Sequence, residues 1–199
     1  MEKANTETNS NKSDENNKME RVCIFIDGSN FYNNTAKKGI NVNFERLIDQ
    51  LTKDKELVNA FYYIASLDFD TNPKKYWSHQ KFLNKLRKIP KFNVVLCKLK
   101  KITDKDQTIH FEVKGDDALL IHDLICGAYE NIYDTAIIVS GDEDFAQIIK
   151  TIQNKGKKVG NAYFKKSSSQ ALRQVCDFSI PMDNLINKII IQKEDSALP

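Results

Sequence analysis

The segment Arg-Val-Cys-Ile-Phe-Ile-Asp, residues 21–27, decides the fold class of this chain. Its apolar run is short, continuous and contains β-branched residues, which is typical of a strand buried on both faces. A strand of that kind belongs to a parallel sheet that helices cover on both sides. The segment ends in an aspartate and continues as Gly-Ser-Asn-Phe, so an acid stands at the carboxyl end of the strand.

Similar apolar segments alternate with amphipathic segments along the rest of the chain. This order predicts an α/β fold with a doubly wound, mostly parallel sheet of five to six strands and helices on both faces. We expect strands at 21–27, 57–65, 92–98, 135–140, 157–162 and 178–181, a small hairpin within 100–113, and helices at 44–51, 73–87, 116–129, 144–154, 168–175 and 183–191.

The two ends of the chain differ in composition from its centre. Residues 1–20 are mostly Asn, Glu, Lys, Ser and Thr, and such a segment cannot bury enough apolar area to offset the entropy lost on ordering. We therefore predict a disordered polar leader over 1–20, one domain over 21–191 and a flexible tail over 192–199.

Composition excludes several classes of protein. No apolar run approaches the ~20 residues that a membrane helix needs, so we expect no membrane partner. The polar start of the chain is unlike a secretory signal. The cysteines, Cys23, Cys97, Cys126 and Cys176, form no C-x-x-C pair, which disfavours a disulfide framework or a zinc site and indicates a reducing, cytoplasmic setting.

Acidic residues follow two of the predicted strands. Asp27 ends the first strand, and Asp142 and Asp144 follow the fourth in the sequence Val-Ser-Gly-Asp-Glu-Asp-Phe. In a doubly wound sheet the binding crevice lies beyond the carboxyl ends of the strands. We therefore expect these acids to lie in one crevice.

A second pair of acids, Asp116 and Asp117, opens the helix that follows the predicted hairpin. The helical period places Asp117 on the apolar stripe that Leu120 and Leu124 continue. If that stripe packs on the sheet, Asp117 points into the same crevice as the acids at the strand ends.

Several carboxylates in one crevice repel one another unless a divalent cation neutralises them. Oxygen ligands favour Mg²⁺ or Mn²⁺, and a pair of such ions can activate a water and stabilise the leaving oxygen of a phosphodiester. No phosphate-binding G-x-x-x-x-G-K-[ST] loop and no G-x-G-x-x-G follows a strand, which disfavours nucleotide-driven chemistry.

Each acid also has a purely structural interpretation, which the residues alone leave open. Asp27 and Gly28 could form a simple turn, and Asn30 could be a turn or cap residue. Either acid after the fourth strand could be an ordinary N-cap, and the pair that opens the helix could complement its dipole.

At these residues the chain resembles the NYN domain family, a branch of the PIN-like metal-dependent ribonucleases, and within it the LabA-like group. The matching motifs, in the family's order, are Ile-Asp-Gly-Ser-Asn-Phe (26–31), Lys-Gly-Asp-Asp-Ala-Leu (114–119), His-Asp-Leu (122–124) and Val-Ser-Gly-Asp-Glu-Asp-Phe (139–145). The resemblance covers roughly residues 21–182.

The resemblance implies a PIN-like fold and a ribonuclease that depends on Mg²⁺ or Mn²⁺ and leaves 3′-hydroxyl and 5′-phosphate ends. The acidic metal-binding cluster that it implies consists of Asp27, Asp117, Asp142 and Asp144, with Asn30 positioning the site. Only some relatives have an acid at the position of Asp116, so either member of the 116–117 pair could be the ligand. Glu143 replaces the commoner small residue between two acids.

An RNA substrate, single-stranded or structured, needs basic groups beside the acids. We expect Lys165 and Lys166, which follow the fifth strand, and the nearby Arg173 to contact its phosphates. Further candidates are lysine runs that stand next to aromatic residues, such as Lys-Lys-Tyr-Trp at 74–77. Such runs are more often solvated surface, and whether the chain forms a homodimer is left open.

Two other interpretations remain. A catalytically weak or inactive member of the family would use the same crevice as an RNA-binding or regulatory protein, because a fold does not guarantee turnover. Another metal-dependent phosphoryl enzyme is disfavoured. A dehalogenase-like phosphatase, for example, needs Asp-x-Asp after the first strand, whereas Gly28 and Ser29 follow Asp27.

Overall fold

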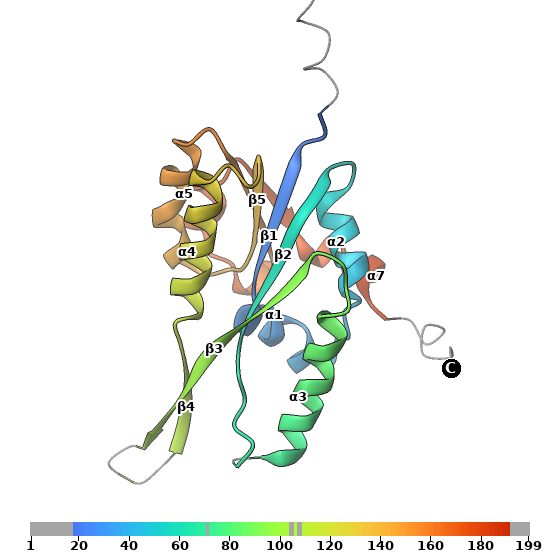
Figure 1. The fold of residues 1–199 in the computed structure, drawn as a ribbon, viewed down its shortest axis with the longest axis vertical. Coiled ribbons are helices and arrows are strands. Elements are labelled where there is room, and N and C mark those ends of the chain that lie inside the picture. The colour runs from blue at the N-terminus through green and yellow to red at the C-terminus, as the bar shows by residue number, and fades with distance from the viewer. Residues whose placement is uncertain (1–17, 71, 104–105, 107–108, 192–199) are drawn as a thin grey trace, which may run out of the picture.

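The computed structural model describes residues 18–70, 72–103, 106 and 109–191, and it places a single sheet between two layers of helices (Figure 1). Within these residues the sheet has seven strands in the order β4-β3-β2-β1-β5-β6-β7. The strands are β1 (Arg21–Asp27), β2 (Glu56–Ala65), β3 (Phe92–Thr103), β4 (Ile109–Lys114), β5 (Thr135–Val139), β6 (Lys158–Tyr163) and β7 (Phe178–Pro181).

Apart from α7, which follows the last strand, the described helices lie between strands in the chain, as in a doubly wound sheet. They are α1 (Gly28–Asn34), α2 (Phe44–Thr52), α3 (Pro73–Leu86), α4 (Asp116–Tyr129), α5 (Ala146–Gln153), α6 (Gln170–Val175) and α7 (Ile186–Ile189). Short 3₁₀ turns precede some of them, including η3 (Glu143–Phe145) and η4 (Lys165–Ser167). None of these described helices is long and apolar enough to cross a membrane.

The predicted doubly wound, mostly parallel α/β sheet is confirmed, but its described part has seven strands where five to six were predicted, because β4 adds an antiparallel strand at one edge. The hairpin predicted within 100–113 is present, because residues 100–103 pair antiparallel with residues 109–112, but its first arm is the end of β3 rather than a separate strand. The helix expected at 183–191 ends at Ile189, because Ile190 is extended and bridges to Val42. The predicted tail and all of the predicted leader except residues 18–20 lie outside the described residues.

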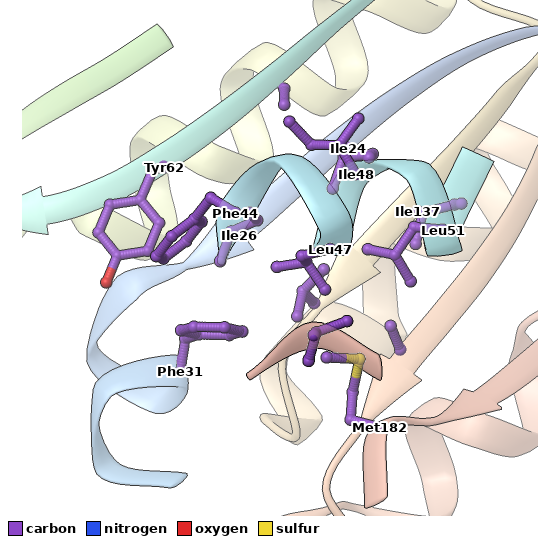
Figure 2. Packing of buried hydrophobic residues seen from close by; sticks show 14 of the residues in the cluster. Ile24, Ile26, Phe31, Phe44, Leu47, Ile48, Leu51, Tyr62, Ile137 and Met182 are labelled. Carbon is purple, nitrogen blue, oxygen red and sulfur yellow. The ribbon is translucent and has the colours of Figure 1, made fainter. Parts of the chain in front are cut away.

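One face of β1 packs against α2. Val22, Ile24 and Ile26 alternate along the strand and point to this face, where they join one hydrophobic cluster. Figure 2 shows Ile24 and Ile26 close to Phe44 and Leu47 of α2. The alternation therefore buries every second residue of β1 under one helical layer.

The opposite face of β1 packs against α4, α5 and α6. Cys23 and Phe25 belong to a second cluster with Leu124 of α4, Ile149 of α5 and Leu172 of α6. Both faces of β1 are thus buried, which explains its continuous apolar sequence. Because β1 pairs with β2 on one side and β5 on the other, the winding reverses here, and a binding crevice is expected at this point.

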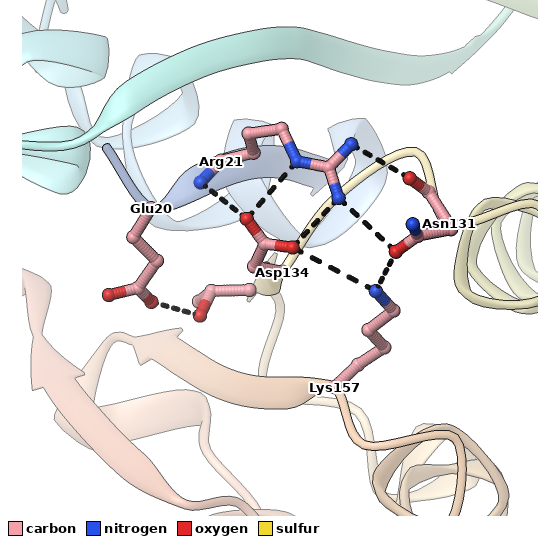
Figure 3. Close-up of polar contacts among 6 residues, drawn as sticks. Glu20, Arg21, Asn131, Asp134 and Lys157 are labelled. Atoms are coloured by element: carbon pink, nitrogen blue, oxygen red, sulfur yellow. Dashed lines mark hydrogen bonds and ion pairs between the residues drawn. The ribbon is translucent and has the colours of Figure 1, made fainter. Parts of the chain in front are cut away.

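An ionic network fixes the register of β1 and β5 at their amino ends (Figure 3). The Arg21 guanidinium donates to both carboxylate oxygens of Asp134, at 3.1 Å from Nε and 2.8 Å from Nη2, and its Nη1 donates to the Asn131 carbonyl at 2.8 Å. Lys157 lies 3.9 Å from Asp134. Hydrogen bonds from Arg21 are the main reason that the pKa of Asp134 falls to about 2. This network aligns the two strands whose carboxyl ends form the site.

Replacing Asp134 by Ala should lower the free energy of unfolding by about 1 kcal/mol, because the bidentate pair with Arg21 is lost from a partly exposed position. The Asp134 pKa is depressed, so the pair stabilises the fold above the ordinary pKa of a carboxyl. The difference between the variant and the wild type should therefore narrow as pH falls towards about 2. Urea denaturation at several pH values measures both effects.

Glu56→Ala is the matched control, because its partner Lys91 is 3.8 Å away and both side chains are about half exposed. We expect this variant to change the free energy of unfolding by less than about 0.5 kcal/mol. Equal losses in the two variants would show that the Arg21 network is no more than a surface ion pair.

Candidate functional site

A cavity of about 360 Å³ opens at the carboxyl edge of the sheet, where β1 meets β5. The side chains that line it are acids or small polar groups from the loops and helices that follow β1, β4 and β5. They are Asp27, Ser29, Asn30, Asn33, Asp116, Asp117 and Asp142. Four of the seven are carboxylates, so the chemistry of the cavity is that of an acidic cluster.

Asp27 is the deepest of these acids and is only 7 % exposed. It ends β1 and caps α1, and its Oδ1 accepts a hydrogen bond from the Asn30 backbone N–H at 2.9 Å. Its Oδ2 accepts from the Ser140 hydroxyl at 2.8 Å. Glycine is required next, because a Cβ at Gly28 would lie 2.3 Å from the Tyr63 carbonyl oxygen. Asp27 is therefore held in one orientation, and it is a cap as well as a cavity residue.

Ser140 is a site residue that the sequence reasoning missed. Its buried hydroxyl donates to Asp27 and accepts from the Asp142 backbone N–H at 3.1 Å, so it links the two acidic loops. The buried Asn161 of β6 supports this loop by donating to the Ser140 carbonyl at 2.9 Å. The sequence does place Ser140 directly before Gly-Asp in the motif at 139–145. Only the tertiary structure shows that its hydroxyl binds Asp27, which is far away in the chain.

Asp142 and Asp144 follow β5 and differ in position. Asp142 lines the cavity and caps η3 by accepting from the Asp144 backbone N–H at 3.0 Å. Asp144 is exposed and is not among the residues that line the cavity, although it contributes to the raised pKa of Asp117. The structure therefore brings Asp142 into the cluster and leaves Asp144 at its border.

Asp116 and Asp117 open α4 and both line the cavity. The preceding Gly115 has a φ of 86°, a conformation that favours glycine and turns the chain from β4 into the helix. The Ser29 hydroxyl lies 3.5 Å from the Asp116 carboxylate, which joins the start of α4 to the start of α1. The geometry thus places both members of the pair at the cavity.

Burial and mutual repulsion shift the ionisation of these acids. Burial is the main reason that the pKa of Asp27 is raised, with smaller contributions from Asp116 and Asp142 and an opposing effect of its two hydrogen bonds. The pKa of Asp117 rises to about 6 because of burial first and then the charges of Asp116, Asp27, Asp142 and Asp144. A cation in the cavity would offset this repulsion.

The donor atoms of the cavity suit a hard divalent cation, because carboxylate, hydroxyl and amide oxygens are the ligands that Mg²⁺ and Mn²⁺ prefer. Among the residues that the structure describes, no three acidic, histidine or cysteine side chains are arranged closely enough to hold an ion together. The residues fit the ion by type and by charge.

Residues 21–183 match the NYN domain, which spans every described strand and the crevice between β1 and β5. The chain belongs to the NYN domain family. NYN domains are generally nucleases of PIN-like fold, and nucleases of this kind typically use divalent metals. The acidic cavity of this NYN domain therefore lies in a protein of a nuclease family.

A crystal structure of a protein of unknown function from Vibrio parahaemolyticus has a similar fold. The two chains share 27 % sequence identity and a TM-score of 0.68, and the alignment covers 90 % of this chain and 99 % of the other. No curated protein sequence matches this NYN domain. The structural likeness thus supports the PIN-like fold, and it says nothing of substrates because the function of the Vibrio protein is unknown.

Of the basic residues predicted to contact RNA, Lys165 and Lys166 lie on the loop after β6, and Arg173 lies on α6. Lys165 and Lys166 are exposed in η4, and neither they nor Arg173 line the cavity. The Arg173 guanidinium lies 4.8 Å from the centre of the Tyr163 ring and donates to the Ser168 carbonyl at 3.2 Å. This packing holds the loop in place.

The same loop is fastened to the acidic site through Gly141. The Ser169 backbone N–H donates to the Gly141 carbonyl at 2.8 Å, and a Cβ at Gly141 would lie 1.7 Å from the Ser167 carbonyl oxygen. Glu143, the residue at which the sequence departs from the family pattern, accepts from the Ser169 hydroxyl at 3.2 Å. The loop that carries the lysines is therefore a direct neighbour of the Asp142 loop.

Mn²⁺ should stabilise the protein more at about pH 7.5 than at about pH 5. The pKa of Asp117 is raised to about 6, so the folded state without metal binds protons more tightly than the unfolded chain. Protonation of Asp117 therefore stabilises the folded state at low pH, and this stabilisation is lost as pH rises through about 6. Above that pH the carboxylates of the cavity are ionised and can bind the cation. Thermal melts with MnCl₂ or EDTA at both pH values measure the shift in Tm.

Asp117→Asn is the control for this experiment, because it removes the group with the raised pKa and keeps the shape of the side chain. We expect a smaller Mn²⁺ shift in this variant with little dependence on pH. If Mn²⁺ raised the Tm of the wild-type protein equally at both pH values, Asp117 would not be part of the cation site.

Proposed function

We propose that this NYN domain is a metal-dependent ribonuclease that hydrolyses RNA phosphodiester bonds with Mg²⁺ or Mn²⁺ held by aspartates. The proposal rests on one observation. Asp27, Asp117 and Asp142, which come from three distant parts of the chain, line a single cavity at the crevice of the sheet. Burial and the neighbouring carboxylates raise the pKa values of Asp27 and Asp117, and a bound divalent cation would offset this unfavourable concentration of charge.

The residues have separate roles in this proposal. Asp27, Asp117 and Asp142 would hold the ion, and Asp116 or Asp144 would complete its ligands or orient a water. When bound, the ion supplies an activated water and offsets the charge that develops on the scissile phosphate. Asn30 and Ser140 hold Asp27 in one orientation through hydrogen bonds, so its carboxylate keeps its direction in the cavity.

RNA is the proposed substrate, and its phosphates need positive charge near the acidic cavity. Lys165 and Lys166 are exposed on the loop that packs against Gly141, beside the Asp142 loop. We propose that these two lysines contact the RNA backbone and that Arg173 keeps their loop in position through its stacking on Tyr163.

Two finer assignments belong to the same proposal. The motifs at 26–31 and 139–145 support a place in the LabA-like group. All four cysteines are free, which supports a reducing, cytoplasmic location. The mass of the protein in solution would show whether it forms the homodimer that the sequence leaves open.

Asp27→Asn and Asp142→Asn should each reduce Mn²⁺-dependent cleavage of RNA by at least about 100-fold, because each removes a charged ligand of the ion. Both substitutions keep the size of the side chain. The experiment follows cleavage of end-labelled RNA and DNA with Mn²⁺, Mg²⁺ or EDTA, and circular dichroism verifies the fold of each variant.

Asp49→Asn is the matched control, since Asp49 is an exposed acid on α2 and does not line the cavity. This variant should cleave RNA like the wild type. Unchanged cleavage in both cavity variants would exclude the proposed mechanism. RNA binding without turnover under all conditions would instead support an inactive, regulatory NYN domain.

A further inference from the structure

Three aromatic side chains at the start of α3 form an exposed cluster. Phe69 precedes the helix, and Tyr76 and Trp77 lie in its first turns. The ring centres are 5.5 Å apart for Phe69 and Tyr76, 6.3 Å for Phe69 and Trp77, and 5.4 Å for Tyr76 and Trp77. Trp77 is nevertheless 58 % exposed and Phe69 45 % exposed. We call these three residues the α3 aromatic cluster.

The geometry of the α3 aromatic cluster differs from that of a core. All three pairs meet nearly edge to face, with interplanar angles of 79° to 90°, and this geometry makes the contacts between the rings favourable. None of the three belongs to either hydrophobic cluster of the sheet, whereas Phe82 further along α3 packs against one of them. Large exposed apolar groups that gather in this way mark an interaction surface.

The charge of α3 identifies the kind of partner. The helix contains four lysines, Lys74, Lys75, Lys81 and Lys85, and no acidic residue. Lys74 and Lys75 directly precede Tyr76 and are exposed. A surface that combines aromatic rings with lysines suits a strand of nucleic acid, because its bases can stack on the rings and its phosphates can pair with the ammonium groups.

The α3 aromatic cluster lies at the same edge of the sheet as the acidic cavity. Asp27 pairs in register with Tyr63 of β2, and β2 continues only to Ala65 before the chain leaves the sheet towards Phe69. In Figure 1, β1 runs downward and leads into α1. Helix α3 begins lower still, at the bottom of the view, so its first turns lie at the end of the molecule that holds the carboxyl end of β1. A single extended strand could therefore contact both places.

We propose that the α3 aromatic cluster binds unpaired bases of single-stranded RNA and feeds the strand into the acidic cavity. This inference rests on the proposed ribonuclease function and adds the structural class of its substrate. The acidic cavity repels a polyanion, so the protein needs a capture surface elsewhere on the same edge. Paired bases hide their faces, and the cluster therefore favours single strands over duplexes.

Trp77 makes the proposal directly measurable, because it is the only tryptophan in the chain. An oligouridine of about 12 nucleotides, added in EDTA so that it stays intact, should quench the tryptophan emission as bases stack on the ring. A blunt RNA duplex of the same length should quench it far less. Anisotropy of the labelled oligonucleotide supplies the affinity independently of the tryptophan.

Trp77→Ala should weaken binding of the oligouridine by at least about 5-fold, and Trp77→Phe, which keeps a ring, should recover part of this loss. Tyr129→Ala is the matched control. Tyr129 is 57 % exposed and has the Lys155 ammonium 3.9 Å from its ring centre, but it lies at the far end of α4 from Asp116. The Tyr129→Ala variant should bind the oligonucleotide with the affinity of the wild-type protein.

The outcomes separate this inference from the proposed function. If RNA binds and is cleaved but Trp77→Ala keeps the wild-type affinity, the inference is wrong and the ribonuclease proposal stands. Equal binding of duplex and single strand, or quenching by anionic vesicles and not by RNA, also overturns it. If the wild type neither binds nor cleaves RNA, both fail. Asp27→Asn should still bind the oligonucleotide in EDTA and should lose cleavage in Mn²⁺, which separates capture of the strand from cleavage.

Discussion

Repulsion between carboxylates at one edge of the sheet is the constraint on which the site depends. Asp27 is buried, and burial with nearby negative charge opposes its ionisation. Hydrogen bonds from the Asn30 N–H and the Ser140 hydroxyl oppose this effect and keep the carboxylate in place. Isolated acids would turn towards solvent, whereas these are attached to rigid strand ends and helix starts. Their crowding creates the negative potential that a divalent cation would relieve.

The rest of the fold serves to hold that edge together. β1 is buried on both faces, and its register with β5 is fixed at the amino ends by the bidentate contact between Arg21 and Asp134. At the carboxyl ends, Gly28 and Gly141 allow backbone contacts that any side chain would prevent. The ionic network and the close contacts thus act at opposite ends of the same two strands. Both are needed for acids from separate loops to meet.

Charge is divided across the molecule in a way that suits a polyanionic substrate. The cavity is acidic, whereas the loop after β6 and helix α3 are basic. Different surfaces at this edge of the sheet would then bind the RNA and cleave it. The lysines and exposed aromatic rings would bind the RNA strand, and the carboxylates of the cavity would bind the ion. A protein that bound RNA only at the cavity would have to overcome its own negative potential.

Local sequence patterns were enough to predict the fold class, most strands and which acids follow them, because the burial of a strand and the face of a helix follow from local periodicity. They predicted β1, α4 and β7 to the residue. Tertiary structure decided what depends on distant partners. Pairing with β4 extended β3 to Thr103, and bridging to Val42 ended the last helix. It also gave Ser140 its role between two loops and left Asp144 at the border of the cavity. Phe31 is buried and Trp77 is exposed although both are aromatic residues in helices, because burial depends on what the fold packs against each ring.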